Sequence, residues 1–274
     1  RVRQVGCVVL LSQSPKGQAR MIMGAWRMWQ WILIFGGLGF SSLEAAAQVE
    51  SGVLALSPAS MPAERSLEEV LNPANPLWKG ARAYSVRLNR TPPLYADGPF
   101  DDGERPETTV RMVRLADQTT VIRIEWADAT VNEFAPAKKY PDTGEAHIYP
   151  LHTENTDTFG DAMAVMVPQA RGPAVSYPSL MMGEAAQPVD IYAWMAGRGF
   201  AWMNAHGRAS TEFAPGFAPG TVQGQASRIS AGWAATVVVP GLVRGTPLCF
   251  AIWDGEKQHR DGVKYFSLWY EVGK

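Results

Sequence analysis

The sequence predicts an all-β fold, an antiparallel β-sandwich with long loops and an extended N-terminal arm. Short runs of β-branched and aromatic residues alternate with Pro, Gly and Asp, a pattern typical of strands joined by turns. No helical period separates these runs, which favours a sandwich or barrel over an α/β fold. The chain has 274 residues, 46% of them hydrophobic, and is therefore long enough to bury one core.

The residues before position 48 resemble a secretory signal peptide. Arg27 supplies a positive charge, Trp31–Phe40 forms an apolar run, and Ala45–Ala47 forms a small-residue cleavage site before Gln48. The apolar run is too short to span a bilayer, so we expect cleavage rather than retention as an anchor. We therefore expect a periplasmic mature protein, with residues 1–47 removed.

The charge of the mature chain argues against nucleic acid and anionic membranes as partners. Residues 1–47 contain five of the 25 basic groups and one of the 26 acidic groups, so the remainder has a net charge near −5. Cys249 is then the single remaining cysteine and cannot form an intramolecular disulfide. Without a C-x-x-C-H run, any haem would have to be held non-covalently.

The mature chain divides into an arm and one domain. Residues 48–78, rich in Ala, Ser and Pro, are expected to form an extended arm in which Ser66–Leu71 makes one helical turn. The sandwich domain is expected over 79–274, with residues 127–160 and 196–224 as long loops. The expected strands are Ala83–Leu88, Thr108–Leu115, Thr119–Trp126, Ala162–Val167, Val189–Met195, Gln225–Val239, Leu248–Trp253 and Tyr265–Val272.

Alternation within one expected strand indicates which side chains face the core. In TTVIRIEWAD, the hydrophobic residues Ile122, Ile124 and Trp126 lie on one side of an extended chain. Arg123 and Glu125 lie on the other side, together with Val121. We therefore expect the first set to be buried.

The sequence contains none of the common catalytic signatures. G-x-S-x-G, H-E-x-x-H, P-loop and dinucleotide-binding motifs are all absent. The four histidines lack metal-site spacing, and His147 and His152 are separated by Pro150, so we expect them to be exposed in a loop. We predict no catalytic residue and no enzyme activity.

Several segments rich in Met and Trp carry a family resemblance. Their order is WADAT (126–130), DAMAVMVP (161–168), YPSLMMG (177–183) leading to a strand, and a terminal WDG, RDGVK and SLWY (253–270). In this order and spacing they resemble the haem b-binding gamma subunits of the ethylbenzene dehydrogenase, dimethyl sulfide dehydrogenase, chlorate reductase and selenate reductase group of periplasmic molybdoenzymes. The resemblance covers most of residues 75–272.

This resemblance implies a β-sandwich with one haem b, bound by a Met thioether and a Lys amine. The implied function is electron transfer between an iron-sulfur beta subunit, which accompanies a molybdopterin alpha subunit, and a soluble cytochrome outside the complex. A lysine can bind iron only as the neutral amine, which a desolvating aromatic wall favours. A soft Met sulfur favours ferrous iron and raises the reduction potential.

The family motifs point to particular residues. Lys264 matches the lysine of the R-D-G-x-K pattern, with Lys257 as the alternative. Met182 matches the methionine of the M-G pair, with Met181 as the alternative. Arg260 is the candidate partner of the haem propionates, because guanidinium pairs with carboxylates in a fork.

Two functions from other classes stay open. A carbohydrate-binding β-sandwich of the cell envelope would use Trp194, Trp202 and Trp233 to stack on sugar rings. An envelope assembly protein would bind no ligand. A pyridine haemochrome spectrum distinguishes the haem protein from both.

The export hypothesis makes the first prediction. Because the small-residue site ends at Ala47, amino-terminal sequencing of protein purified from the periplasm should find a start at Gln48 or within a few residues of it. A mature protein that retains residues before Trp31 would overturn both cleavage and the periplasmic location.

Overall fold

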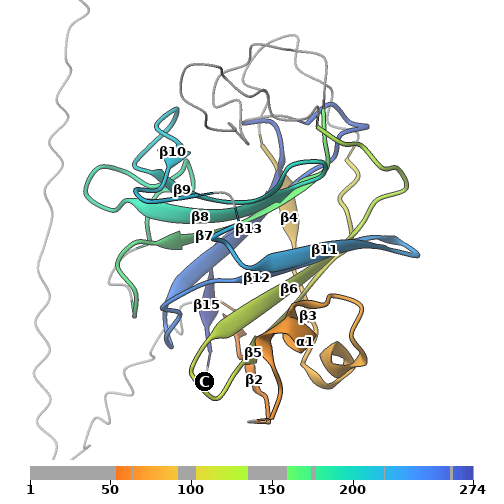
Figure 1. The fold of residues 1–274 in the computed structure, drawn as a ribbon. Helices are drawn as coiled ribbons and strands as arrows, with labels where there is room; N and C mark the ends of the chain where they lie inside the picture. The colour runs from red at the N-terminus through yellow and green to blue at the C-terminus, as the bar shows by residue number, and fades with distance from the viewer. Residues whose placement is uncertain are drawn as a thin grey trace, which may run out of the picture. The chain divides into compact units, whose positions relative to one another are not determined.

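Two β-sheets pack face to face in the computed structural model (Figure 1). The structure describes residues 54–62, 64–91, 103–134, 159–173, 177–218, 220–259 and 262–273. All of these belong to one compact unit, Val49–Lys274. Within the described residues the fold is nearly all β, with one short α-helix, as the sequence predicted.

The larger sheet has nine strands in the order β1-β15-β13-β7-β8-β9-β10, with β14 paired to β13 and β4. Neighbouring strands are antiparallel except for the short parallel pair β1 and β15. Its strands are β1 (Ala55–Leu56), β4 (Leu88–Arg90), β7 (Ala162–Pro168), β8 (Val189–Met195), β9 (Gly199–Ala205), β10 (Glu212–Phe213), β13 (Pro247–Trp253), β14 (Tyr265–Ser267) and β15 (Tyr270–Val272).

The smaller sheet has six strands in the order β11-β12-β6-β5-β2, with β3 paired to β5. Its edge strand β2 runs parallel to β5, and the other pairs are antiparallel. Its strands are β2 (Ala59–Ser60), β3 (Tyr84–Ser85), β5 (Thr108–Arg114), β6 (Thr120–Ala127), β11 (Gly224–Ile229) and β12 (Gly232–Val238).

The expected strands are present, with four differences. The run 83–88 is divided between β3 in the smaller sheet and β4, which begins at Leu88, in the larger sheet. The run 225–239 is a hairpin, β11 and β12, rather than one strand, and the run 265–272 is broken at Leu268–Trp269 into β14 and β15. Residues 196–224, expected as a loop, contain β9 and β10. The strand β9 begins with Gly and holds two Ala and one Asn, residues with little intrinsic β-propensity, so its place in the sheet depends on pairing with β8.

The main core fills the space between the sheets. Ile122, Ile124 and Trp126 of β6 are buried there, as alternation in the sequence predicted. The Trp194 ring lies 6.0 Å from Trp126 and 4.8 Å from Trp233, centroid to centroid, so aromatic contacts join β8 to β6 and β12. Tilted aromatic pairs at this spacing stabilise a core beyond their buried area.

Residues 66–80, which include the end of the expected arm (48–78), pack on the outer face of the smaller sheet, and the helical turn expected at Ser66–Leu71 is confirmed. They form helix α1 (Leu67–Leu71), capped by Ser66 and Glu69, and the 3-10 turn η1 (Pro76–Gly80). Val70, Leu71 and Trp78 are buried against Val113 and Val121 of the sheet. Val121, on the side opposite the core, is therefore buried as well.

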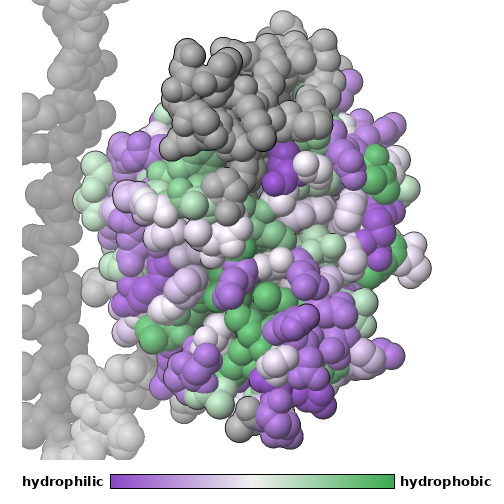
Figure 2. Space-filling model, in the orientation of Figure 1, coloured by the Kyte–Doolittle hydropathy of each residue, from purple (hydrophilic) through white to green (hydrophobic). Residues whose placement is uncertain are grey.

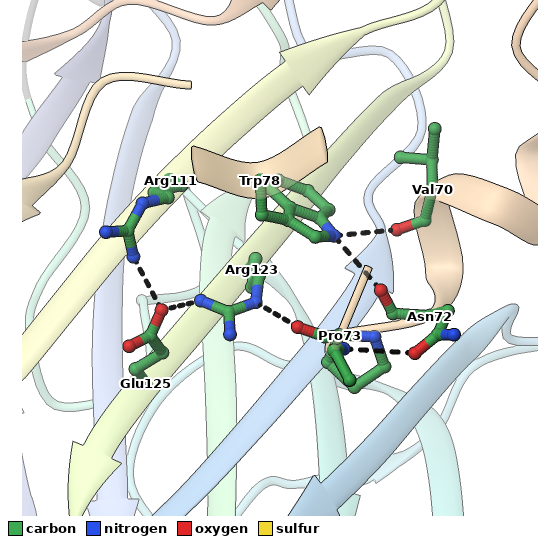
Figure 3. Close-up of polar contacts among 8 residues, drawn as sticks. Val70, Asn72, Pro73, Trp78, Arg111, Arg123 and Glu125 are labelled. Carbon is green, nitrogen blue, oxygen red and sulfur yellow. Dashed lines mark hydrogen bonds and ion pairs between the residues drawn. The ribbon is translucent and has the colours of Figure 1, made fainter. Parts of the chain in front are cut away.

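Polar contacts fix this segment to β6 (Figure 3). The Trp78 indole donates to the carbonyls of Val70 at 3.1 Å and Asn72 at 3.2 Å, and Arg123 Nε donates to the Pro73 carbonyl at 2.7 Å. Glu125 forms ion pairs with Arg123 and Arg111. Burial, and then the charge of Arg111, lowers the pKa of Arg123 to about 10, so Arg123 stays charged at neutral pH.

Hydrophobic and hydrophilic residues are interspersed on the face drawn in Figure 2. The large exposed hydrophobic residues of the described chain are Leu54, Val131, Met181, Val243 and Leu268, which come from separate segments. Among the described residues, no helix has the length and apolar character needed to cross a membrane.

The packing of the 66–80 segment predicts the effect of removing its anchor. Trp78→Ala should lower the free energy of unfolding by about 3–5 kcal/mol, because a buried indole leaves a cavity, as measured by chemical denaturation. Leu268→Ala is the control, because this side chain is 60% exposed, and should change stability by less than about 0.5 kcal/mol. Equal midpoints for the two variants would show that the segment does not contribute to the domain.

Candidate functional site

The outer face of the larger sheet contains a row of four alanines. Ala251, Ala164, Ala193 and Ala201 are direct cross-strand partners on β13, β7, β8 and β9. Side chains alternate along a strand, so this row faces away from the core that holds Met163 and its neighbours. No side chain in this row extends beyond a methyl group.

A second row on the same face is larger and contains sulfur. Cys249, Met166, Ile191 and Met203 are paired across the same four strands. We call the two rows together the outer apolar face. Its members are buried except for Ala251, which is partly exposed, and Leu180, Met182, Phe213, Trp253 and Trp269 pack against it. Both sides of the sheet are buried, which explains why β7 and β8 also carry hydrophobic residues at the positions that face away from the core.

Lys264 lies beside this face, just before β14. Thr91 fixes the Lys264 backbone, because its amide donates to the Lys264 carbonyl at 3.0 Å and its hydroxyl accepts from the Lys264 amide at 2.9 Å. The Lys264 ammonium is 5.2 Å from the centre of the Trp253 ring. Burial raises the pKa of Cys249 to about 12, and the charge of Lys264 acts in the opposite direction. Lys264 therefore acts electrostatically on the sulfur row.

Lys257, the alternative lysine, has a different environment. Its ammonium forms an ion pair with Glu104 at 3.2 Å and lies 5.8 Å from the centre of the Tyr265 ring. Arg90 and Arg105 also lie within 6 Å of that ring. Tyr265 belongs to the core, on the side of β14 opposite Lys264. The two lysines near the chain end thus pack on different aromatic rings, Lys257 on Tyr265 and Lys264 on Trp253.

Met182 lies at the far corner of the outer apolar face. It adopts a positive φ of 68° in the turn before β8, and its carbonyl accepts from the Gly207 amide at 2.9 Å. The Thr211 hydroxyl contacts the Met182 sulfur at 3.3 Å, which places the thioether at the edge of β9 and β10. Met181 beside it is 48% exposed.

The structure does not bring Met182 and Lys264 together. Lys264 comes just before Tyr265, which pairs with Ile252. This position is at the opposite edge and the opposite end of the sheet from Met182. With strands about 4.8 Å apart and about 3.4 Å per residue, the two positions are roughly 30 Å apart. Their side chains cannot reach one iron from there.

Met166, which was not among the ligands predicted from the sequence, lies closer to Lys264. It pairs directly with Cys249, the residue on which the charge of Lys264 acts, and it is 8% exposed. It lies two strands and about four residues from Lys264 on the same face of the sheet, roughly 17 Å by the same spacings. The period-two pattern of DAMAVMVP could have separated Met166 from the core residue Met163, but the sequence could not show which lysine lies nearby.

The remaining candidates are distributed as follows. Arg260, His147 and His152 lie outside the described residues, and His206 is exposed. His259 is completely buried, and its ring packs edge-to-face with Tyr265 at 4.7 Å between ring centroids, which the sequence did not indicate. A buried ring at the end of the charged loop helps to fix that loop to the core.

The three tryptophans proposed for sugar stacking do not form an exposed platform. Trp194 and Trp233 are each 7% exposed, within the core between the sheets. Trp202 is partly buried and stacks on Tyr192 at 6.0 Å. In this arrangement Trp194 and Trp233 cannot present a ring face to a sugar.

A comparison with curated proteins shows a distant similarity to the subunit of an oxidoreductase. The chain is 26% identical over 169 residues to the chlorate reductase subunit gamma of Ideonella dechloratans, an alignment covering 55% of this chain and 58% of that protein. This similarity supports the gamma-subunit family of molybdoenzymes at most. The chain matches less than two thirds of that relative's length.

Two other comparisons add no functional information. No family model matches the chain. Among solved structures, a candidate carbohydrate-binding protein from Bacteroides uniformis ATCC 8492 is 12% identical, with a TM-score of 0.47 over 80% of this chain and 90% of that one. This similarity is too low to support a conclusion about function.

Burial of the outer apolar face predicts an inert thiol. In a Cys7→Ser background, Cys249 should not react with Ellman's reagent near neutral pH until the protein is unfolded, because its pKa is raised to about 12 and it is 5% exposed. Leu268→Cys in the same background is the matched control and should react at once. Rapid labelling of native Cys249 would show that the face is open.

Proposed function

We propose that this chain is a non-catalytic electron-transfer subunit of an oxidoreductase complex and carries one non-covalent haem b against its outer apolar face. The observation that carries the proposal is a lysine held beside a buried, sulfur-containing face of the sheet. The similarity to a chlorate reductase gamma subunit supports it independently. When bound, the haem would supply a one-electron redox centre.

The described residues supply an apolar surface for a flat cofactor, and the segments that now bury this surface would have to move for haem to bind there. The alanine row offers a strip with short side chains, and Ile191, Met203 and Trp253 provide apolar contacts around it. Porphyrins need such a shell, since its hydrophobicity and exclusion of water tune the potential of the iron. The buried alanines would lie against the ring, and each larger side chain introduced there would compete with it for space.

Lys264 would supply the amine ligand. Thr91, which follows β4, forms hydrogen bonds with the backbone of Lys264 and so fixes the position from which its side chain extends. The neighbouring Trp253 ring and the buried sulfur row lie on one side of this chain. Binding to iron would require the amine to be neutral. Lys257, paired with Glu104, lacks such surroundings.

Met166 would supply the sulfur ligand in place of Met182, which the sequence favoured. The reason is the register of the sheet, which puts Met166 beside Cys249 and Met182 at the far corner. A Met182 ligand would require the turn at residues 178–187 to move across the face of the sheet. A thioether in either case favours the reduced iron and a higher potential.

Location and partners follow from the same family argument. A gamma subunit would work in the periplasm, after removal of residues 1–47, beside an iron-sulfur beta subunit and a molybdopterin alpha subunit. It would pass electrons between the iron-sulfur subunit and a soluble cytochrome. Arg260 would pair with a haem propionate.

Substitution of the ligands tests the proposal. For this test the full chain is expressed with export to the periplasm. The wild type should then give a b-type pyridine haemochrome spectrum. Lys264→Ala and Met166→Leu should each alter the low-spin spectrum, and Met166→Leu should lower the reduction potential by on the order of 100 mV, because axial ligands tune haem over about 0.8 V. Lys264→Arg should also alter the low-spin spectrum, because guanidinium stays protonated and cannot bind iron.

Matched controls separate the alternatives. Lys257→Ala and Met181→Leu should leave the spectrum unchanged. A changed spectrum in Met182→Leu with none in Met166→Leu would restore the Met182 assignment. Unchanged spectra in every variant would show that Met and Lys are not the iron ligands. The absence of haem from the wild type would contradict the haem proposal and favour the carbohydrate-binding or ligand-free alternatives.

A further inference from the structure

Three aspartates from distant segments converge at one edge of the sandwich. Asp128 follows β6, Asp161 precedes β7, and Asp254 follows β13. One carboxylate oxygen from each lies within 4.8 Å of the others. Each aspartate belongs to a motif noted in the sequence, WADAT, DAMAVMVP or WDG, and the proposed electron-transfer function uses none of the three.

Asp161 is the fixed centre of the cluster. It is completely buried, and its Oδ2 accepts from the Asn132 amide at 2.8 Å and the Trp233 indole at 3.0 Å. Its Oδ1 accepts from the Gly255 amide at 3.0 Å. These three N–H groups come from separate segments, so the orientation of this carboxylate is determined by the fold.

Asp128 has a buried oxygen that lacks a partner. The residue is 7% exposed, and its Oδ1 accepts from the Thr130 amide at 3.0 Å, while its Oδ2 is buried and accepts no hydrogen bond. Burial raises the pKa of Asp128 to about 6, and the charges of Asp161 and Asp254 act in the same direction. A buried carboxylate oxygen without a donor costs free energy.

The neighbouring cations do not form ion pairs with the cluster. Burial raises the pKa of Asp254, and the charge of Lys257 acts in the opposite direction. The Arg228 guanidinium donates to the carbonyls of Thr130 at 2.8 Å and Asp128 at 3.1 Å, rather than to a carboxylate. Lys257 donates its backbone amide to Asp254, while its ammonium pairs with Glu104. Within the described residues, none of the three carboxylates forms an ion pair with a basic side chain.

We propose that Asp128, Asp161 and Asp254 bind one divalent cation, Ca²⁺, at the junction of the two sheets. Three carboxylates form a hard, all-oxygen donor set, which suits Ca²⁺ rather than Zn²⁺ or copper. Ca²⁺ binds oxygen ligands at longer distances and in a more flexible geometry than Mg²⁺. The three carboxylate oxygens lie within 4.8 Å of one another, close enough to share one such ion.

Such an ion would be a structural cross-link. It would join the end of β6, in the smaller sheet, to β7 and β13 in the larger sheet. It would also hold the start of the loop 254–264, which leads to Lys264. The site depends only on the three aspartates and is independent of whether haem binds.

Thermal unfolding of the full chain tests the site with CaCl₂ as the probe. After EDTA treatment and buffer exchange, Ca²⁺ at about 100 times its Kd should raise Tm by roughly 5–10 °C, and MgCl₂ should raise it less. Asp254→Asn, at the partly exposed ligand, should abolish the shift. Glu64→Gln, an exposed acid outside the cluster, should retain it.

Asp128→Asn distinguishes a cation from a shared proton. If protons alone neutralise the cluster, Ca²⁺ leaves the wild type unchanged, and Asp128→Asn raises Tm because it removes repulsion. If Ca²⁺ binds, Asp128→Asn loses the Ca²⁺-dependent shift. The proposal is overturned if Tm is insensitive to Ca²⁺, or if both aspartate variants shift as the wild type does; none of these readouts depends on haem.

Discussion

The register that pairs β7 with β8 and β13 is the constraint on which the rest of this structure depends. Every residue of β7 and β8 is buried, so one set of alternate side chains enters the core and the other set forms the outer apolar face. A slip of one residue would exchange the two sets and place Tyr192 and Trp194 outside. The alanine row, the sulfur row and the core tryptophans are therefore consequences of a single register.

That register also explains how much the sequence could predict. Strands such as β5, β6 and β8 combine β-branched or aromatic residues with clear boundaries, so composition and alternation suffice to find them. Helix α1 begins with a capping box formed by Ser66 and Glu69, and the helical turn predicted at Ser66–Leu71 is confirmed. β9 begins with Gly and contains two Ala and one Asn, so its formation depends on its pairing with β8. Local propensity carries no information about such contacts.

The candidate site shows the same division. The choice of Lys264 over Lys257 rested on a motif. The structure shows that the two ammonium groups lie beside different rings, Lys257 beside Tyr265 and Lys264 beside Trp253. The choice among methionines rested on a two-residue M-G pattern. Which methionine lies near Lys264 depends on the order of four strands, and this order is not encoded in any one segment.

The convergence of Asp128, Asp161 and Asp254 extends this argument to the ends of the strands. In the sequence each aspartate is unremarkable, since Asp is common where a strand meets a turn. The structure places all three at the same edge, with Asp161 held by donors from Asn132, Trp233 and Gly255. Placing three carboxylates together, two of them buried, is unfavourable unless a proton or a cation compensates them. Their convergence where both sheets and the segment leading to Lys264 meet therefore links the stability of the sandwich edge to the position of the proposed ligand.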